Sequence, residues 1–468
     1  MNRGVAVAVK RLRARVIATS VLLLILVLVC CAPRRSFFAP RNDIDSIARS
    51  YVRLALALGE RDPDSLDFSL ASASLSAEVH KSYPSLDTIR AQTEALSRQL
   101  HALHVPAEQS NRVEFLAGQL AAIEARTKML QGQREDFDTE ARSLFGTTRL
   151  PDTRAEERRM LRAKIAALLP VAKPGESEAD RYARYNRQFI VPRDKLLPVM
   201  NAALALCRQR TAEHITLPPG ESVDLTLVRD KPWAAFSRYM GHAHSVIALN
   251  LDMPLTVDDA LELACHEGYP GHHVFNMLRD QSLVQRQHLP EAEVQLTFSP
   301  QSYLSEAAAA YAPEMAFAPE ERAQVERDVL FPLAGLRVQE AERAAEIDRL
   351  VRMLDSSEPA IAHDYVDGTL EFVRAEQVLA GEALMANSEP VLLYLNEYRS
   401  YMLAYTDGPR RLAANLATVE ATSPMKTIAA DRTERWKLYE QFMRTLQFHL
   451  EESVSTASPA TSTTPKDR

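Results

Sequence analysis

Apolar residues recur every three or four positions over most of the chain, with charged residues between them, and this spacing predicts amphipathic helices. Such helices are expected at 44–62, 85–105, 111–134, 154–169, 301–318, 319–355, 359–386, 390–405 and 424–451. The stretch 176–214 predicts two more helices, broken near Pro192. No period of 20–50 residues repeats, so a solenoid is not expected.

The pattern changes at residues 214–252, where short β-branched segments bounded by Pro or Gly predict a sheet of two to four strands. One segment, SVIALNLDM, directly precedes a helix expected from Thr256 to Arg279, with Thr256 as the N-cap and Asp259 three residues on. As an edge strand, it would be free to pair with an extended peptide. The predicted fold is therefore mainly α, a long helical fold around a central cleft, with a small sheet beside this helix.

Composition agrees with a helical, globular body. Hydrophobic residues make up 46% of the chain and charged residues 25%, and there are only 14 glycines. Residues 43–451 are expected to form one helical domain. The end of the chain, 452–468, lacks apolar residues to bury and is predicted to be disordered.

The N-terminus has the features of a targeting segment. Seven of the 55 basic residues and no acids lie in residues 1–35, around an apolar run at 16–32. This segment is interpreted as a lipoprotein signal with lipidation at Cys31, as an uncleaved anchor, or as a cleaved signal. All three place the body outside the cytoplasmic membrane, in the cell envelope. The remaining chain has 48 basic and 62 acidic residues, which argues against a nucleic-acid partner.

The body contains only two cysteines, Cys207 and Cys265. They could form one disulfide in an oxidising compartment. Two buried free thiols are the favoured interpretation. A cysteine metal cluster is excluded, because no C-x-x-C pair exists outside the leader.

The sequence CHEGYPGHHV at 265–274 begins like the zinc-peptidase pattern H-E-x-x-H, but Pro270 occupies the place of the second histidine. On a regular helix His272 would lie about 120° around the axis from His266, too far to share a metal ion. Pro270 and Gly271 predict a break in the helix, because proline cannot donate the next hydrogen bond and glycine permits unusual backbone angles. Such a kink can return a histidine to His266, and His272 is preferred over His273.

Two histidines need a third ligand to form a catalytic zinc site. Glu306 begins an alanine run in SYLSEAAAAYAPEM, and its helix could approach the histidines closely. A carboxylate in such an interface is costly unless it is paired or bound to metal. The alternative is that Glu306 is a solvated helix residue. His242 and His244 have no ligand-like spacing to Glu306 and are interpreted as loop histidines.

These segments resemble a widespread bacterial family of unknown function, often envelope lipoproteins, that belongs with the thermolysin-like (gluzincin) metallopeptidases. Its first motif, H-E-x-x-P-G-H-H, is intact at 266–273. Its second, E-G-W-x-x-Y-x-E, is reduced to Glu306 and Tyr311 in EAAAAYAPE, without Gly-Trp. Its third, P-G-Q-x-x-x-Y-x-x-G, keeps Tyr405 and Gly408 in RSYMLAYTDG.

The resemblance implies His266, His272 and Glu306 as zinc ligands and Glu267 as the general base that activates water. Tyr405 is the first candidate for stabilising the oxyanion, followed by Tyr401 and Arg399. The implied activity is zinc-dependent hydrolysis of peptides or small proteins. Two alternatives remain: a catalytically impaired pseudo-peptidase or helical binding protein, and a zinc amidase on non-peptide substrates.

Overall fold

The computed structural model describes residues 43–152, 155–231, 233–385, 388–422 and 428–446. The leader with Cys31 and the tail 452–468 lie outside the described residues, so both remain predictions. Among the helices that the structure describes, none is long and apolar enough to cross a membrane.

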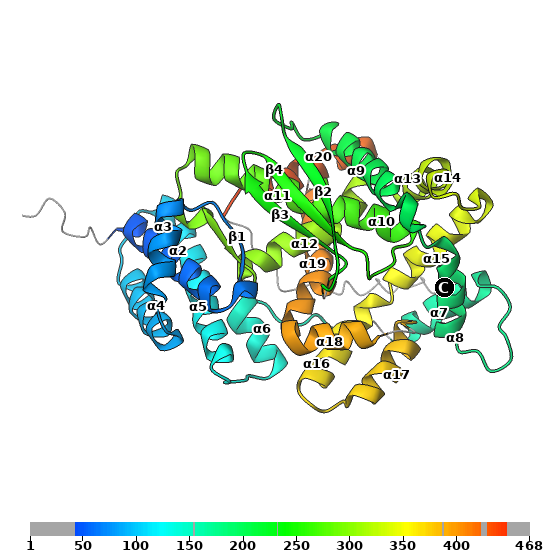
Figure 1. Ribbon diagram of the computed structural model, residues 1–468, viewed down its shortest axis with the longest axis horizontal. Helices are drawn as coiled ribbons and strands as arrows, with labels where there is room; N and C mark the ends of the chain where they lie inside the picture. Colours follow the sequence, from blue (N-terminus) through cyan, green and yellow to red (C-terminus); the bar gives the residue numbers. More distant parts are fainter. Residues whose placement is uncertain (1–42, 153–154, 232, 386–387, 423–427, 447–468) are drawn as a thin grey trace, which may run out of the picture.

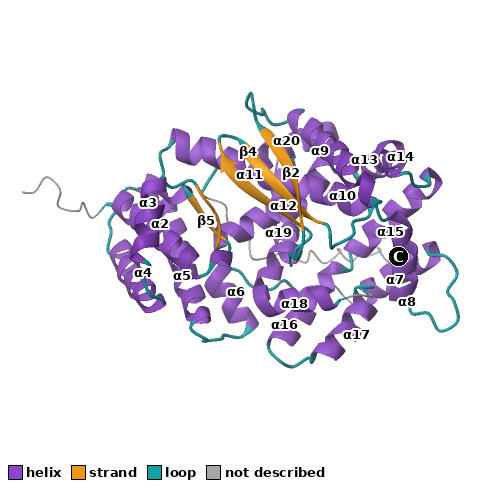
Figure 2. Ribbon diagram, in the orientation of Figure 1, coloured by secondary structure: helices purple, strands orange, loops and turns teal. Residues whose placement is uncertain are grey.

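The protein is mainly helical with two small sheets (Figures 1 and 2), as the apolar spacing predicts. The N-terminal helices pack around one hydrophobic cluster that includes Ile47, Leu58 and Leu116. Asp43 and Ser85 cap two of them by accepting backbone N–H bonds. These helices are α2 (Ile44–Arg61), α3 (Ala73–Ser82), α4 (Leu86–His101) and α5 (Ser110–Leu130).

The predicted sheet at 214–252 has three strands, β2 (Ser222–Val228), β3 (Ala235–Gly241) and β4 (His244–Asn250), in the order β2-β4-β3. β4 runs parallel to β2 and antiparallel to β3. The predicted edge position of SVIALNLDM is wrong, because β4 is bonded on both sides and cannot accept a further strand.

A second sheet, not predicted, pairs β1 (Leu66–Ser69) with β5 (Val294–Leu296) in antiparallel orientation. β1 lies next to β3, where the rings of Phe68 and Tyr239 are 5.9 Å apart.

The largest hydrophobic cluster lies under the three-stranded sheet and joins most of the remaining helices. Two long predicted helices are interrupted here. The segment 319–355 contains a π-turn at Glu326–Leu330 and a left-handed Gly335, while 256–279 breaks after Leu263. The helices are α7 (Ala155–Leu168), α8 (Glu178–Asn186), α9 (Leu196–Ala212), α10 (Val257–Leu263), α11 (His272–Arg279), α12 (Pro300–Ala316), α13 (Pro319–Val325), α14 (Phe331–Ala334), α15 (Ala341–Arg352) and α20 (Ile428–Met443).

A third cluster holds α6 (Phe137–Phe145), α16 (Glu358–Val366), α17 (Phe372–Glu382), α18 (Glu389–Tyr398) and the start of α19 (Leu403–Thr422). The helix predicted over 390–405 ends at Tyr398, so Tyr405 belongs to α19. α12 and α19 pack side by side at the centre of the molecule (Figure 1). Their contact is close, because a Cβ added at Gly408 would lie 2.9 Å from that of Ala307.

Candidate metal centre

The histidine motif lies at a break between α10 and α11. α10 begins at the predicted capping box, in which Thr256 and Asp259 bond reciprocally. After Leu263 the chain forms a π-turn over Ala264–Gly268, and α11 starts only at His272. The N–H of Gly271 donates to the carbonyl of Cys265 at 3.0 Å, which closes the turn.

Gly271 makes this turn sterically feasible. A Cβ at this position would lie 1.8 Å from the carbonyl oxygen of His266, so no other residue fits without moving the backbone. The turn brings the rings of His266 and His272 to 4.9 Å between centroids. A straight helix would separate the two residues by about 9 Å along its axis. The predicted kink is confirmed.

Glu306 approaches both histidines from α12. Its Oε2 lies 3.4 Å from Nε2 of His266, and its Oε1 lies 3.4 Å from Nε2 of His272. The three potential donor atoms all lie within 4.8 Å of one another, and the three side chains are 10–13% exposed. Glu306 is therefore not the solvated residue of the alternative interpretation.

The residues fit a metal ion. Oε2 of Glu306 is buried without a hydrogen-bond partner, an arrangement that is costly unless a cation completes it. Two imidazoles and one carboxylate also match the three-ligand set of a catalytic zinc site, which leaves a fourth position open. The geometry supports a divalent metal without identifying it.

Neighbouring hydroxyls hold two of these side chains in place. Nδ1 of His272 lies 3.2 Å from Oγ of Ser305, and the hydroxyl of Tyr401 donates to Oε1 of Glu306 at 3.0 Å. Ser302 contacts the same tyrosine hydroxyl at 3.0 Å. Contacts of this kind orient metal ligands in other proteins.

Burial and charge set the ionisation of the site. Burial acts to raise the pKa of Glu306, but His272 and His266 outweigh it and hold the pKa well below its usual range. Burial acts to lower the pKa of His272, but Glu306, Glu267 and Asp67 raise it to about 9. Burial raises the pKa of Glu267, and the charges of His266 and His272 oppose this rise.

The three candidates for oxyanion stabilisation differ in exposure and in the partners that they contact. The ring of Tyr405 stacks on His266 with centroids 6.2 Å apart, and the residue is 39% exposed. Tyr401 is buried and donates to Glu306. Arg399 forms a buried ion pair with Glu140, so its charge is already compensated. Tyr405 is thus the candidate best placed to reach a substrate.

The other histidines lie apart from the three donor atoms. His273 is fully buried on a different face of α11, where Nδ1 contacts Ser245 at 2.8 Å and Nε2 contacts Glu221 at 3.2 Å. His244 bonds to Asp224 at 3.0 Å. His242 has a left-handed backbone, with φ of 54°, in the β3–β4 turn. The preference for His272 over His273 agrees with this placement.

Glu221 is the centre of a buried network that sequence spacing does not reveal. Besides His273, it accepts bonds from the hydroxyl of Tyr269 and from Arg208 on α9, both at 2.6 Å. These three donors lower the pKa of Glu221 to about 2, against the opposing effect of burial. Because Tyr269 and His273 flank Pro270–Gly271, the network holds the second half of the turn.

Cys207 and Cys265 form a disulfide, so the favoured interpretation of two free thiols is wrong. α9 packs against the π-turn and places the two Cα atoms 5.5 Å apart, within the range that a disulfide spans. The bond fixes the residue directly before His266. Two adjacent residues of α9, Cys207 and Arg208, therefore hold both ends of the turn.

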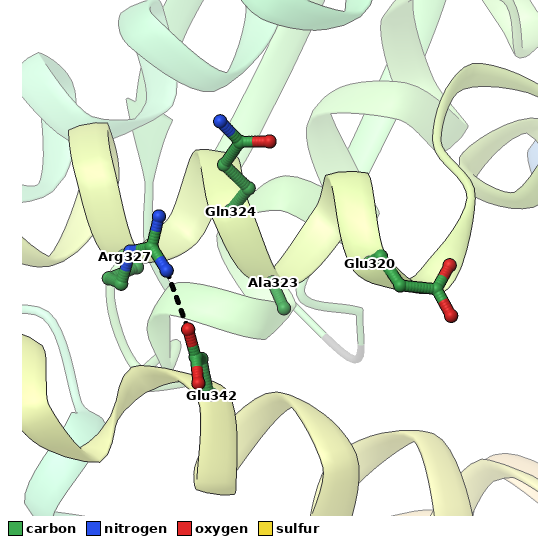
Figure 3. Close-up of a pocket in the computed structure, with 5 residues that line it drawn as sticks. All are labelled: Glu320, Ala323, Gln324, Arg327 and Glu342. Carbon is green, nitrogen blue, oxygen red and sulfur yellow. Dashed lines mark hydrogen bonds and ion pairs between the residues drawn. The ribbon is translucent and has the colours of Figure 1, made fainter.

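A pocket of about 290 Å³ lies elsewhere, between α13 and α15. Figure 3 shows its lining residues, with Arg327 bonded to Glu342 across the opening. The pocket shares no residue with the metal centre. Its lining residues are Glu320, Ala323, Gln324, Arg327 and Glu342.

Comparison with known proteins gives only remote similarity. No family model and no curated protein matches the chain. A solved M32 carboxypeptidase from Deinococcus radiodurans R1 is similar with a TM-score of 0.43 and 15% identity, over 86% of this chain and 89% of that one. A structure named CHT is similar with a TM-score of 0.39 and 13% identity, over 86% and 90%. Similarity this remote defines neither family nor activity, so the family resemblance of the motifs stays a prediction.

Proposed function

We propose that the chain is a zinc-dependent hydrolase of peptide bonds. The observation that carries the proposal is the convergence of His266, His272 and Glu306 within 4.8 Å, with one carboxylate oxygen left without a hydrogen-bond partner. Bound zinc would polarise the scissile carbonyl and make a water molecule acidic enough to attack it. Peptides or small proteins are the proposed substrates.

Glu267 is the proposed general base. It lies within the π-turn, directly after His266, is 5% exposed, and has a pKa raised by burial. A pKa closer to neutrality suits a group that takes a proton from water and returns it to the leaving amine.

Tyr405 is the proposed donor to the oxyanion. Tyr405 is partly exposed and its ring stacks on His266, whereas Tyr401 is buried and its hydroxyl donates to Glu306. A preorganised donor at the position where charge develops stabilises the transition state. Tyr401 is a positioning residue in this proposal.

The test combines Glu267→Gln with a matched control, Glu213→Gln, which changes an exposed glutamate at the end of α9. Zinc-loaded wild type and control should cleave a mixed peptide library, and Glu267→Gln should bind zinc but lose at least about 100-fold in rate. Unchanged cleavage by Glu267→Gln would exclude it as the base. Zinc binding without cleavage in wild type would favour a pseudo-peptidase, and cleavage confined to non-peptide amides would favour the amidase.

Attachment to the cell envelope through Cys31 is a separate part of the proposal. It rests on the basic and apolar N-terminal segment. Metabolic labelling with a fatty acid should modify the wild type and not Cys31→Ala. Labelling that persists in Cys31→Ala would overturn the assignment of Cys31.

A further inference from the structure

Asp67 lies on β1 at an irregular point of the second sheet. The register between β1 and β5 shifts between Leu66 and Phe68, which leaves Asp67 at a bulge. Bulges often redirect a side chain beside an active site. Nε2 of Gln295 on β5 donates to the carboxylate at 2.7 Å, and Gln301 donates to Gln295 at 3.0 Å, so the side chain is held in one orientation.

Asp67 lies close enough to the metal centre for its charge to act on the residues there. The carboxylate interacts electrostatically with His272, Glu306 and Glu267, and it also raises the pKa of Tyr401. These four residues come from four different elements that surround the centre, α11, α12, the π-turn and the turn before α19. The residue as a whole is partly exposed.

Within the part of the chain that the structure describes, the printed hydrogen-bond partner of the Asp67 carboxylate is the neutral amide of Gln295. Nδ1 of His272 contacts Ser305, and its Nε2 faces Glu306 within the metal centre. Among the described residues, no lysine, arginine or histidine forms an ion pair with Asp67. Burial raises the pKa of Asp67 to about 6, which still leaves it ionised at pH 7. A divalent ion would balance Glu306 and Glu267 and leave the charge of Asp67 uncompensated.

Among the described residues, one candidate cation for a substrate carboxylate is already compensated. Arg399, the arginine nearest in sequence to Tyr401, is paired with Glu140 and bonds to the carbonyl of Glu135. The charges of the site therefore favour a cationic group on the substrate over an anionic one.

We propose that Asp67 is a specificity-determining residue that binds a protonated amine of the substrate beside the scissile bond. This inference rests on the proposed function. The amine is either the free N-terminus of a peptide or the side chain of a lysine, and both offer a charged ammonium group with N–H donors. A charge-assisted bond to a carboxylate of this kind corresponds to a preference of about 10- to 100-fold.

The experiment compares tetra-alanine amide with its N-acetylated form and with N-acetylated peptides that carry one lysine at each position in turn. For each peptide, kcat/KM is measured with zinc-loaded wild type, Asp67→Asn, and the control Asp64→Asn, which changes an exposed aspartate on the preceding turn. Wild type and control should prefer an amine-bearing peptide by about tenfold or more, and Asp67→Asn should reduce the ratio to about one.

A second arm measures binding of the same peptides by calorimetry to zinc-loaded Glu267→Gln protein, with and without Asp67→Asn. This arm separates the inference from the proposed function, because the preference for peptides with a free amine is measured as binding affinity even if no peptide is cleaved. If Asp67→Asn removes a preference for the peptide with a free N-terminus, Asp67 binds the α-amine. If Asp67→Asn instead removes a preference for a lysine-bearing peptide, Asp67 binds the lysine side chain. The inference is overturned if wild type cleaves and binds amine-bearing and acetylated peptides equally well, or if Asp67→Asn keeps the preference of wild type.

Discussion

Replacing Glu221 with Gln tests whether the buried network positions the metal ligands. The change removes the charge that accepts bonds from Tyr269, Arg208 and His273 at 2.6, 2.6 and 3.2 Å. The side chain of Glu221 is 1% exposed. A pKa of about 2 against an ordinary 4.5 corresponds to roughly 3 kcal/mol. Breaking a buried ion pair typically costs about 3–5 kcal/mol. We therefore expect the free energy of unfolding, measured with urea at pH 7, to fall by about 3 kcal/mol in the variant.

The same variant should bind zinc about 10- to 100-fold more weakly, because Tyr269 and His273 no longer hold the turn before His272. The matched control is Glu291→Gln, a fully buried glutamate that accepts two bonds from Arg112 away from the metal centre. It should lose comparable stability and keep the zinc affinity of wild type, measured by competition with a chelator. Equal zinc affinity in both variants would refute a positioning role for Glu221.

Three further results are expected. The stability difference between wild type and Glu221→Gln should shrink as pH falls from about 4.5 toward 2, because a carboxylate with a lowered pKa stabilises the fold only while it is ionised. Urea unfolding at pH 6 and pH 3.5 measures the stability difference between the two proteins. A difference that is the same at both pH values would contradict the expectation. Tyr401→Phe should lower zinc affinity about tenfold, whereas Tyr405→Phe should lower kcat and leave zinc affinity unchanged; the reverse pattern would exchange their roles. Gly408→Leu should cost about 1–3 kcal/mol, because α19 approaches Ala307 too closely for a side chain, and unaltered thermal unfolding would argue against that contact.

Local patterns predicted the features that depend on neighbouring residues. The helical spacing, the cap at Thr256 and the break at Pro270–Gly271 all follow from short-range chemistry, and the structure has each of them. His266, His272 and Glu306 meet as expected, because the break shortens the distance between the histidines and the alanine run lets α12 approach.

Features that depend on distant segments could not be read from the sequence. The disulfide requires α9 to pack against the π-turn across 58 residues, and the central position of β4 requires the pairing order of the sheet. Glu221 is separated from His273 by 52 residues, and Asp67 lies on a strand that pairs more than 200 residues away. Neither residue stands in a motif, so only the folded chain shows what each contacts.

The measurement that tests the central claim most directly is the zinc content of the purified protein and of Glu306→Ala. Wild type should retain about one zinc ion per chain after dialysis, as a site with three protein ligands predicts, and Glu306→Ala should lose it while remaining folded. A wild-type protein without zinc after loading, or a Glu306→Ala variant that retains a full equivalent, would contradict the assignment of His266, His272 and Glu306 as a metal centre.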